Sequence, residues 1–278
     1  MTIEEFIENA LKEDIGDGDH TSLACIDKTK RGKAQLLVKQ EGIIAGVDVA
    51  KTIYQLFDAG LKLDLFIKDG DAIKKGDVVF TIEGNVISIL STERLVLNFM
   101  QRMSGIATYT NKIVKLLEGL PVKILDTRKT SPNLRIFEKK AVELGGGFNH
   151  RFGLFDMILI KDNHIDFAGG IEQAIEATQL YLKDILKNLP IEIEARSLED
   201  VKEIMRIGKV NRIMLDNFTP EQLKKAITLI DHQYETEASG GITIENIRSY
   251  AETGVDFISV GALTHQIKSL DLSLKALK

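Results

Sequence analysis

Six short apolar runs, each followed by a segment with helical periodicity, constrain the fold of this chain more than any other feature. The runs are Val122–Leu125, Met157–Ile160, Ile191–Ala195, Arg212–Leu215, Glu235–Ala238 and Phe257–Val260. Strands that alternate with helices predict a parallel sheet, and their regular spacing favours a barrel over an open doubly wound sheet. Because a complete barrel has about eight such repeats, we expect an incomplete, open α/β barrel of about six to seven parallel strands.

The segments between these runs carry helix start signals. A helix N-terminus is marked by a side chain that accepts the first free N–H groups, or by a proline in the first turn. Such signals occur at Ser131-Pro132, at Ser197 with Asp200, and at Thr219-Pro220 with Gln222. The sequence therefore predicts that helices begin at these three places.

The first ninety residues have a different pattern. Thr2 and Glu5 form a capping box for an amphipathic helix, which we expect to end in a polar loop at Asp14–Ser22. Short strands follow between Lys33 and Leu90, with Asp-Gly and Lys-Gly turns between alternating apolar residues, as in small β-sandwiches. A helix is predicted within this region at Val47–Phe57.

The next predicted helix begins at Ser91-Thr92 and carries an unusual polar face. Arg94, Asn98 and Gln101 follow one another at helical spacing and share that face. A solvent-exposed face would more typically carry lysine and glutamate. We therefore expect this face to be covered, for example by another subunit.

Composition bounds the class of protein. The chain has 278 residues, of which 44% are hydrophobic and 28% are charged, as in ordinary globular proteins of one large or two modest domains. It has no run of about eighteen apolar residues and no charged-then-apolar leader, so we expect neither a membrane span nor a secretory signal. Cys25 is the single cysteine, which excludes an internal disulfide framework and favours a reducing, cytoplasmic location.

Cationic side chains gather between Leu125 and His164, although the whole chain has a net charge of −5. A local excess of cations in an acidic protein indicates a small anionic ligand, because a nucleic-acid footprint would spread basic charge over a whole face. Three of these cations have helical spacing and are expected to face solvent, namely Arg135, Lys139 and Lys140. The others fall at expected turns or strand ends, where ligands bind more often: Arg128, Lys129, His150, Arg151, Lys161 and His164.

Polar residues follow each predicted strand, at the edge where parallel α/β folds bind their ligands. Glu194 and Asp216 end neighbouring strands and could hold Mg²⁺ together with substrate oxygens, the usual arrangement for a diphosphate substrate. Glu192 shares a strand face with Glu194 but lies deeper. We expect it to belong to a buried layer of ion pairs in which Lys123 and Arg212 neutralise it.

Two further groups of strand-end residues suit anions. Small residues that let backbone N–H groups reach a phosphate follow the last two strands, at Ser239-Gly240-Gly241 and Gly261-Ala262. Guanidinium groups pair with carboxylates in bidentate geometry, so a dicarboxylate would suit Arg128 and Arg151 with Lys129 and His150. The residues alone therefore indicate a phosphate site, a divalent metal site and a carboxylate site at one edge.

Eight sequence motifs resemble those of the quinolinate phosphoribosyltransferases, also called nicotinate-nucleotide pyrophosphorylases (carboxylating). They occur in the order ERLVLNFMQRMSGIAT, DTRKTSPNLR, GGGFNHR, LIKDNH, IEIEA, IMLDNF, EASGGI and SVGALTH. One departure is Asn133, where the family usually has glycine; because asparagine tolerates a left-handed turn, we expect little consequence. The resemblance implies an N-terminal α/β sandwich domain, residues 1–104, which residues 268–278 can rejoin, and a barrel domain, residues 105–267.

The resemblance also implies an activity and roles for residues. The family condenses quinolinate with phosphoribosyl pyrophosphate, giving nicotinate mononucleotide, pyrophosphate and CO₂ in NAD biosynthesis. Matching positions assign quinolinate to Arg128, Lys129, His150 and Arg151, with Arg94 donated by the partner of a homodimer whose dimers can pair further into hexamers. Lys161 matches a lysine that touches both substrates, and Glu194 and Asp216 match the metal and ribose carboxylates. The positions that bind the phosphates of phosphoribosyl pyrophosphate match Lys129, Lys161, Ser239, Gly240, Gly241, Gly261 and Ala262.

Three other functions are compatible with parts of this pattern. A paralogous family linked to molybdenum transport shares the scaffold and the TRK and HR motifs, but the KDNH segment fits the quinolinate family better. A barrel aldolase would use Lys161 as a Schiff-base amine, which usually needs apolar surroundings. A sensor of phosphorylated metabolites would bind the same anions without turnover, although paired carboxylates would weaken anion binding unless a metal were present.

Overall fold

The computed structural model describes residues 2–277, which divide into two compact units. The first unit comprises the residues up to Asn111, Ile136–Gly146 and the residues from Gln266 onward. The second unit comprises Lys112–Arg135 and Gly147–His265. No helix among residues 2–277 is long and apolar enough to cross a membrane.

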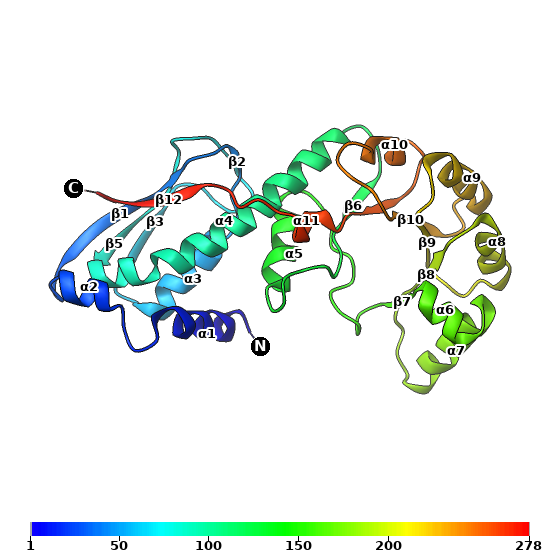
Figure 1. Cartoon of the computed structure of the whole chain (residues 1–278), viewed down its shortest axis with the longest axis horizontal. Helices are drawn as coiled ribbons and strands as arrows, with labels where there is room; N and C mark the ends of the chain where they lie inside the picture. The colour runs from blue at the N-terminus through cyan, green and yellow to red at the C-terminus, as the bar shows by residue number, and fades with distance from the viewer. Residues whose placement is uncertain (1, 278) are drawn as a thin grey trace. The chain divides into compact units, whose positions relative to one another are not determined.

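An antiparallel sheet forms the centre of the first unit (Figure 1), in the order β12-β1-β5-β3. These strands are β1 (Arg31–Val38), β3 (Lys62–Leu65), β5 (Val78–Asn85) and β12 (Leu272–Leu277), and a separate pair consists of β2 (Gly42–Ile43) and β4 (Ala72–Ile73). Leu36 of β1 and Phe80 of β5 are fully buried, and the Phe80 ring meets Tyr54 of α3 (Val47–Phe57) edge to face, with ring centroids 6.0 Å apart. The sequence prediction of α3 is confirmed.

The long helix α4 (Val86–Leu116) corrects the prediction of a helix that begins at Ser91-Thr92. It starts five residues earlier than expected, because the Asn85 side chain accepts the N–H groups of Ile87 and Ser88 and so caps it. Gly105 lies inside this helix, where an added Cβ would collide with the Lys268 carbonyl oxygen. Close backbone packing explains the glycine there.

The amino-terminal helices also differ from prediction in one respect. The capping box of Thr2 and Glu5 is present and begins α1 (Ile3–Ile15). The predicted polar loop at Asp14–Ser22 is shorter, because α1 continues through Ile15. Only four residues separate it from α2 (His20–Cys25), which the Asp19 side chain caps. In the same unit, α5 (Arg135–Leu144) packs Phe137 against the rings of Phe6 and Phe99.

A parallel sheet of six strands forms the second unit, and every predicted strand is present within one residue of its predicted bounds. The strands are β6 (Lys123–Leu125), β7 (Ile158–Ile160), β8 (Ile191–Ala195), β9 (Arg212–Asp216), β10 (Glu235–Ser239) and β11 (Phe257–Ser259). The order is β6-β11-β10-β9-β8-β7, so the first strand pairs with the last and the sheet stays open between β6 and β7. This is the open α/β barrel that the sequence predicts.

Helices cover the outer face of this sheet (Figure 1). They are α6 (Asp162–Ala168), α7 (Ile171–Asp184), α8 (Leu198–Ile207), α9 (Pro220–Ile230), α10 (Ile247–Ala251) and α11 (Ala262–His265). The predicted starts of α8 and α9 are confirmed, since Ser197 and Thr219 accept N–H groups of the first turn. Ser131-Pro132 precedes a turn instead, and α5 begins at Arg135.

Alternation along the strands separates two kinds of side chain, because successive residues of a strand point to opposite faces. Ile193, Leu215 and Ala238 point toward the helices and are fully buried. Glu192, Glu194, Arg212, Asp216 and Glu237 alternate with them and belong to the inner face. The interior of this barrel is therefore polar, and its upper rim carries the predicted site.

Candidate active site

Lys161, Glu194 and Asp216 come together at the carboxyl ends of β7, β8 and β9. The Lys161 ammonium lies 3.3 Å from one oxygen of the Glu194 carboxylate, and the backbone N–H of Asp162 donates to the other at 2.8 Å. Burial and the nearby Glu194 raise the pKa of Asp216, whereas a hydrogen bond from Ser239 and the charge of Lys161 lower it. Two carboxylates, one lysine and one serine thus share a small space.

The loops beside this group place Arg128 and Arg151 close to its carboxylates. Burial, followed by the charge of Arg128, lowers the pKa of Arg151, while Glu192, Asp156 and Glu194 act in the opposite direction. Charge effects between side chains weaken with distance, so the groups that act on Arg151 lie near it. Arg128, Arg151 and Glu194 are therefore neighbours at one edge of the sheet, and the Arg151 side chain is fixed by a 3.1 Å bond from its Nη1 to the Met157 carbonyl oxygen.

The loop that carries Arg128 is held by Arg135. Its guanidinium donates to the Thr130 hydroxyl at 3.0 Å, to the Phe152 carbonyl oxygen at 3.0 Å and to the Arg128 carbonyl oxygen at 3.5 Å. We had expected Arg135, Lys139 and Lys140 to face solvent. That expectation is wrong for Lys139, which is buried, and it did not foresee that Arg135 holds the loop. It is confirmed for Lys140, which is exposed and pairs with Glu143.

Asn133 in the same loop adopts a left-handed conformation with φ 65°. Asparagine is one of the few side chains that tolerate this region, so the loop keeps the turn that the family usually makes with glycine. The prediction that this departure has little structural consequence agrees with the observed backbone.

Lys129 and Gly261 lie against each other on the first and last strand ends. The Thr264 hydroxyl donates to the Lys129 carbonyl oxygen at 2.8 Å, and a Cβ on Gly261 would stand 3.0 Å from Cδ of Lys129 and 3.1 Å from Nε2 of His265. A side chain at position 261 would therefore displace the lysine. Gly261 leads directly into α11 through Ala262.

The Ser239-Gly240-Gly241 turn is built differently from its prediction. Gly240 and Gly241 both have positive φ, 91° and 62°, and a Cβ on Gly240 would stand 2.2 Å from Oδ1 of Asn217. Helix α10 begins only at Ile247, so no helix N-terminus lies directly behind these glycines. Any phosphate here would meet the backbone N–H groups of the turn rather than the end of a helix.

The remaining predicted residues are placed elsewhere. Arg94 is exposed on α4 in the first unit, and Gln101 on the same helix donates to the Leu272 carbonyl oxygen at 2.9 Å. His164 accepts the backbone N–H of Lys161 on Nδ1 at 2.9 Å. It therefore caps α6 locally.

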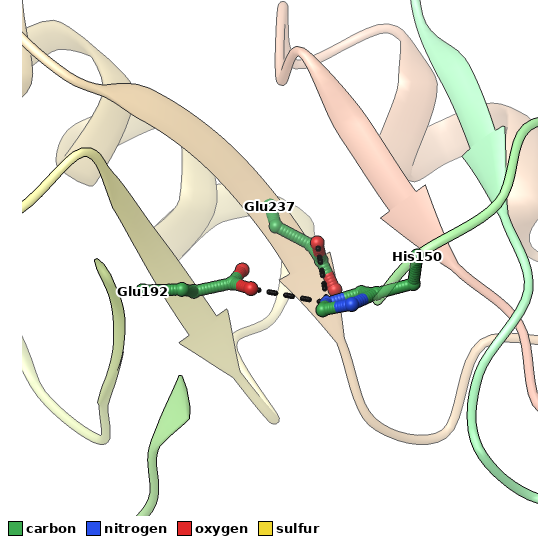
Figure 2. Close-up of side chains that lie close together, drawn as sticks. All are labelled: His150, Glu192 and Glu237. Carbon is green, nitrogen blue, oxygen red and sulfur yellow. Dashed lines mark ion pairs between the residues drawn. The ribbon is translucent and has the colours of Figure 1, made fainter. Parts of the chain in front are cut away.

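His150 is buried, although the sequence placed it among the anion-binding side chains. Its side chain is 6% exposed, and its Nε2 lies 3.0 Å from Glu192 and 3.5 Å from Glu237, neither of which is exposed at all (Figure 2). The prediction that Lys123 and Arg212 together neutralise Glu192 is corrected for Lys123 only: burial raises the pKa of Glu192, and the charge of Arg212 lowers it. Lys123 lies over the rings of Phe148 and Phe257, and Arg212 pairs with Glu235 at 3.0 Å and Glu237 at 3.1 Å.

Sequence reasoning missed Asp126 and Glu237, which hold the loop that carries His150 and Arg151. Asp126 is buried and accepts the backbone N–H of His150 at 2.8 Å. Glu237 lies beneath the rim on β10. Its signal was present in the sequence: a glutamate at an inward-facing position of a central strand is unusual unless it has a partner.

The alternatives can be compared with this geometry. A Schiff-base lysine needs apolar surroundings, but Lys161 forms an ion pair with Glu194 and lies near Asp216. The charged surroundings do not favour an aldolase. A pure anion sensor would not be expected to place Glu194 and Asp216 side by side at the anion-binding edge.

Comparison with known proteins identifies the family. A profile described as "Quinolinate phosphoribosyl transferase, N-terminal domain" matches residues 19–104, and the corresponding C-terminal domain profile matches residues 106–275. The chain is 43% identical to quinolinate phosphoribosyltransferase [decarboxylating] 2 of Nicotiana glauca, over 98% of this chain and 82% of the relative. It is 41% identical to the probable nicotinate-nucleotide pyrophosphorylase [carboxylating] of Bacillus subtilis, over 99% and 93% respectively.

Solved structures agree with the sequence matches. The crystal structure of NadC from Streptococcus pyogenes superposes with a TM-score of 0.93 at 41% identity, covering 99% of this chain and 97% of that one. The nicotinate-nucleotide pyrophosphorylase of Francisella tularensis gives a TM-score of 0.93 at 39% identity, with 99% and 96% coverage. Both domain profiles and these relatives lead to one conclusion: this chain belongs to the quinolinate phosphoribosyltransferase family.

Proposed function

We propose that this protein transfers the phosphoribosyl group of phosphoribosyl pyrophosphate to quinolinate and releases pyrophosphate and CO₂, with nicotinate mononucleotide as the product. Family membership supports the reaction. The observation that carries the assignment of the site is the meeting of Lys161, Glu194 and Asp216 beside Arg128 and Arg151. A cationic region and a pair of carboxylates adjoin there, as one dianionic acceptor and one activated sugar require.

Arg128, Lys129 and Arg151 would bind the two carboxylates of quinolinate. Guanidinium groups suit this role because each can form two parallel hydrogen bonds with one carboxylate. Burial of Arg151 strengthens its attraction for an anion, since the local dielectric is lower than that of water. These residues would orient the ring nitrogen toward the sugar, which is catalysis by positioning.

Glu194 and Asp216 would hold Mg²⁺, and their surroundings fit a divalent cation. Asp216 is partly buried next to Glu194, an arrangement of like charges that a bound cation would relieve. Mg²⁺, when bound, would neutralise charge on the pyrophosphate group. Lys161 would contact the same group, and the turns at Ser239-Gly240-Gly241 and Gly261-Ala262 would bind phosphate through backbone N–H groups.

Electrostatic stabilisation would then account for the chemistry without a covalent intermediate. As the bond from the sugar to pyrophosphate breaks, positive charge develops on the ribose. Glu194 and Asp216 would offset that charge, because both lie beside Lys161, which would contact the pyrophosphate group. Attack by the ring nitrogen gives that nitrogen a positive charge. The electron pair of the bond to the adjacent carboxylate then stays on the ring carbon, where the neighbouring cationic nitrogen stabilises it, as CO₂ leaves. That carbon takes a proton from solvent to give nicotinate mononucleotide, so no separate cofactor is needed for decarboxylation.

A homodimer with shared sites is part of the proposal, with Arg94 supplied by the partner and with pairing of dimers into hexamers as a further step. Its support is the exposed position of Arg94 on α4 within the first unit and the family resemblance. Arg94→Ala should abolish quinolinate use without unfolding the protein. Mixing it with Lys161→Ala should restore part of the activity in mixed dimers, and no recovery in confirmed mixed dimers would remove the shared-site proposal.

We infer a cytoplasmic location from the single cysteine, which suits a reducing compartment. The central experiment is an assay of purified protein with quinolinate, phosphoribosyl pyrophosphate and Mg²⁺, with nicotinate mononucleotide and CO₂ as readouts. Nicotinate in place of quinolinate is the control, because a site built for two carboxylates should not use it. Turnover of nicotinate would contradict the assignment of the arginines, and loss of activity with chelator is expected from the metal site.

A further inference from the structure

A buried cluster of His150, Glu192 and Glu237 lies beneath the rim of the barrel and has no place in the chemistry described above. Figure 2 shows the three side chains converging from a loop, from β8 and from β10. One ring nitrogen of His150, Nε2, faces both carboxylates, at 3.0 Å and 3.5 Å. Arg212 contacts the same cluster through its 3.1 Å bond to Glu237.

The other ring nitrogen of His150 defines where its proton lies. The backbone N–H of Arg151 points at Nδ1 of His150 over 2.7 Å. An N–H group can only donate, so Nδ1 must accept and cannot carry a hydrogen. The ring proton is therefore on Nε2, the nitrogen that lies 3.0 Å from the Glu192 carboxylate and 3.5 Å from that of Glu237.

This arrangement distinguishes a proton-mediated cluster from a metal site. The ligand atoms of His150, Glu192 and Glu237 lie within 4.8 Å of one another, close enough for a metal ion. A histidine that binds metal through Nε2 normally donates an N–H from Nδ1 to a neighbouring acceptor. Here Nδ1 receives an N–H instead, so metal binding would require a ring without any proton.

We propose that Glu192 and Glu237 are positioning residues for the recognition of quinolinate: they hold the His150 ring through Nε2, and the ring fixes the backbone that carries Arg151. This inference rests on the proposed function, which assigns Arg151 to the substrate. Two links hold that backbone from below, namely Arg151 N–H to His150 Nδ1 and His150 N–H to Asp126 at 2.8 Å. Within residues 2–277, the Arg151 guanidinium itself forms one hydrogen bond, which it donates to the Met157 carbonyl oxygen.

Burial of the two glutamates and their contacts hold the His150 ring in one orientation. Glu192 and Glu237 are fully buried, and Arg212 divides its contacts between Glu237 and Glu235. A buried acidic group without a polar partner is costly, which favours the close approach of His150 Nε2 to both side chains. The ring cannot rotate without leaving both carboxylates and the Arg151 N–H group unpaired.

Substitution of the carboxylates tests the proposal. In Glu192→Leu and Glu237→Leu, the dissociation constant for quinolinate should rise about tenfold, which corresponds to about 1.4 kcal/mol. The KM for phosphoribosyl pyrophosphate and kcat at saturating quinolinate should change less than about twofold, because an interaction equal in ground and transition states acts on binding alone. Glu192→Gln and Glu237→Gln keep an acceptor oxygen and should recover most of the affinity.

Glu235 provides the matched control. It lies on the same strand as Glu237 and binds the same arginine, but its side chain is 55% exposed. It has no ion pair with His150 among the residues described here, so Glu235→Leu should leave the affinity for quinolinate within about twofold of the wild type. Equal losses in the Glu235 and Glu237 variants would overturn the proposal, because they would point to Arg212 or to general stability.

A double-mutant cycle separates positioning from mere structural support. If Glu237 acts through Arg151, then Glu237→Leu should weaken quinolinate binding less than about twofold further in an Arg151→Ala background. Fully additive losses would overturn the proposal. If the leucine variants do not fold, the same cycle with Glu237→Gln decides, since that variant keeps the size and one acceptor of the side chain.

The ring nitrogens can also be observed directly. In protein labelled with ¹⁵N in its five histidines, the resonances assigned through His150→Gln should show an unprotonated Nδ1 and a protonated Nε2. A proton on Nδ1, or stoichiometric metal that is lost in His150→Gln, would overturn the proposal. If wild-type protein fails to bind quinolinate at all, the proposed function fails; if it binds and the carboxylate variants bind equally well, this inference alone fails.

Discussion

Both sheets of this protein contain fully buried side chains, but those of the first sheet are apolar and those of the second sheet include acidic groups. In the antiparallel sheet of the first unit, Leu36, Phe80 and Ile82 have no exposed surface. In the parallel sheet of the second unit, Glu192 and Glu237 have none either. Burial raises the pKa of Glu192 to about 7 and that of Glu237 to about 8, which shows how unfavourable their charged forms are.

This difference teaches that the interior of the second unit is organised for binding rather than for stability alone. A buried apolar side chain stabilises the fold in proportion to the area it removes from water. A buried charge costs free energy unless it is paired, and apolar replacements can be neutral or stabilising. Glu192 and Glu237 lie next to the loop with His150 and Arg151, so support of that loop is a functional reason for burying acidic groups there.

Truncation in the first sheet should have the largest effect on stability. Phe80→Ala removes a fully buried ring that packs against Tyr54, and it should lower the free energy of unfolding by about 3–5 kcal/mol. Denaturant titration measures this. The KM values of the remaining folded protein should stay unchanged. A change in the KM for quinolinate would contradict the view that the first sheet contributes to stability and not to substrate binding.

Truncation at the rim of the second sheet should instead remove activity with little loss of stability. Lys161 is 48% exposed, so Lys161→Ala should shift the melting temperature by less than about 1 °C, an effect of about a few tenths of a kcal/mol. Activity should fall by a factor of about 10²–10³, as for other groups that stabilise transition-state charge. Lys140→Ala, at an exposed helical position, is the control and should change neither quantity.

The stability of the second unit should decrease as pH rises. Because the folded-state pKa of Glu237 is raised to about 8, the folded protein holds a proton that the unfolded chain loses above its ordinary pKa of 4.5. The stabilisation is complete below pH 4.5 and is lost as pH rises to 8, by on the order of 1 kcal/mol per pH unit at most. Hydrogen exchange of β10 amides at pH 5 to 8 measures this, and Glu237→Gln should flatten the slope.

The smallest predicted effect on substrate use concerns the loop that Arg135 holds. Arg135→Ala removes hydrogen bonds to Thr130, Phe152 and Arg128, which should cost about 1–2 kcal/mol of stability. The KM for quinolinate should rise several-fold because Arg128 becomes less well positioned, while kcat changes less. An unchanged KM would show that this loop keeps its conformation without Arg135.

Local patterns alone predicted much of this protein. The strand Ile191–Ala195 and the helix Val47–Phe57 have the predicted bounds, and the caps at Thr2, Ser197 and Thr219 are present. Alternation and capping act between residues a few positions apart, so they can be read without the fold. Because parallel strands end at one edge, the sequence also indicated which side chains would gather there.

Tertiary structure decided everything that depends on distant residues. The pairing of β6 with β11 leaves the barrel open, β12 pairs with β1 from the far end of the chain, and Ile136–Gly146 belongs with the first unit although the sequence placed it in the barrel. The partners of His150 lie 42 and 87 residues further along, at Glu192 and Glu237. Periodicity shows which face of a strand a glutamate occupies, but only the folded register determines which side chain meets it, and that partner sets whether a buried charge is tolerated.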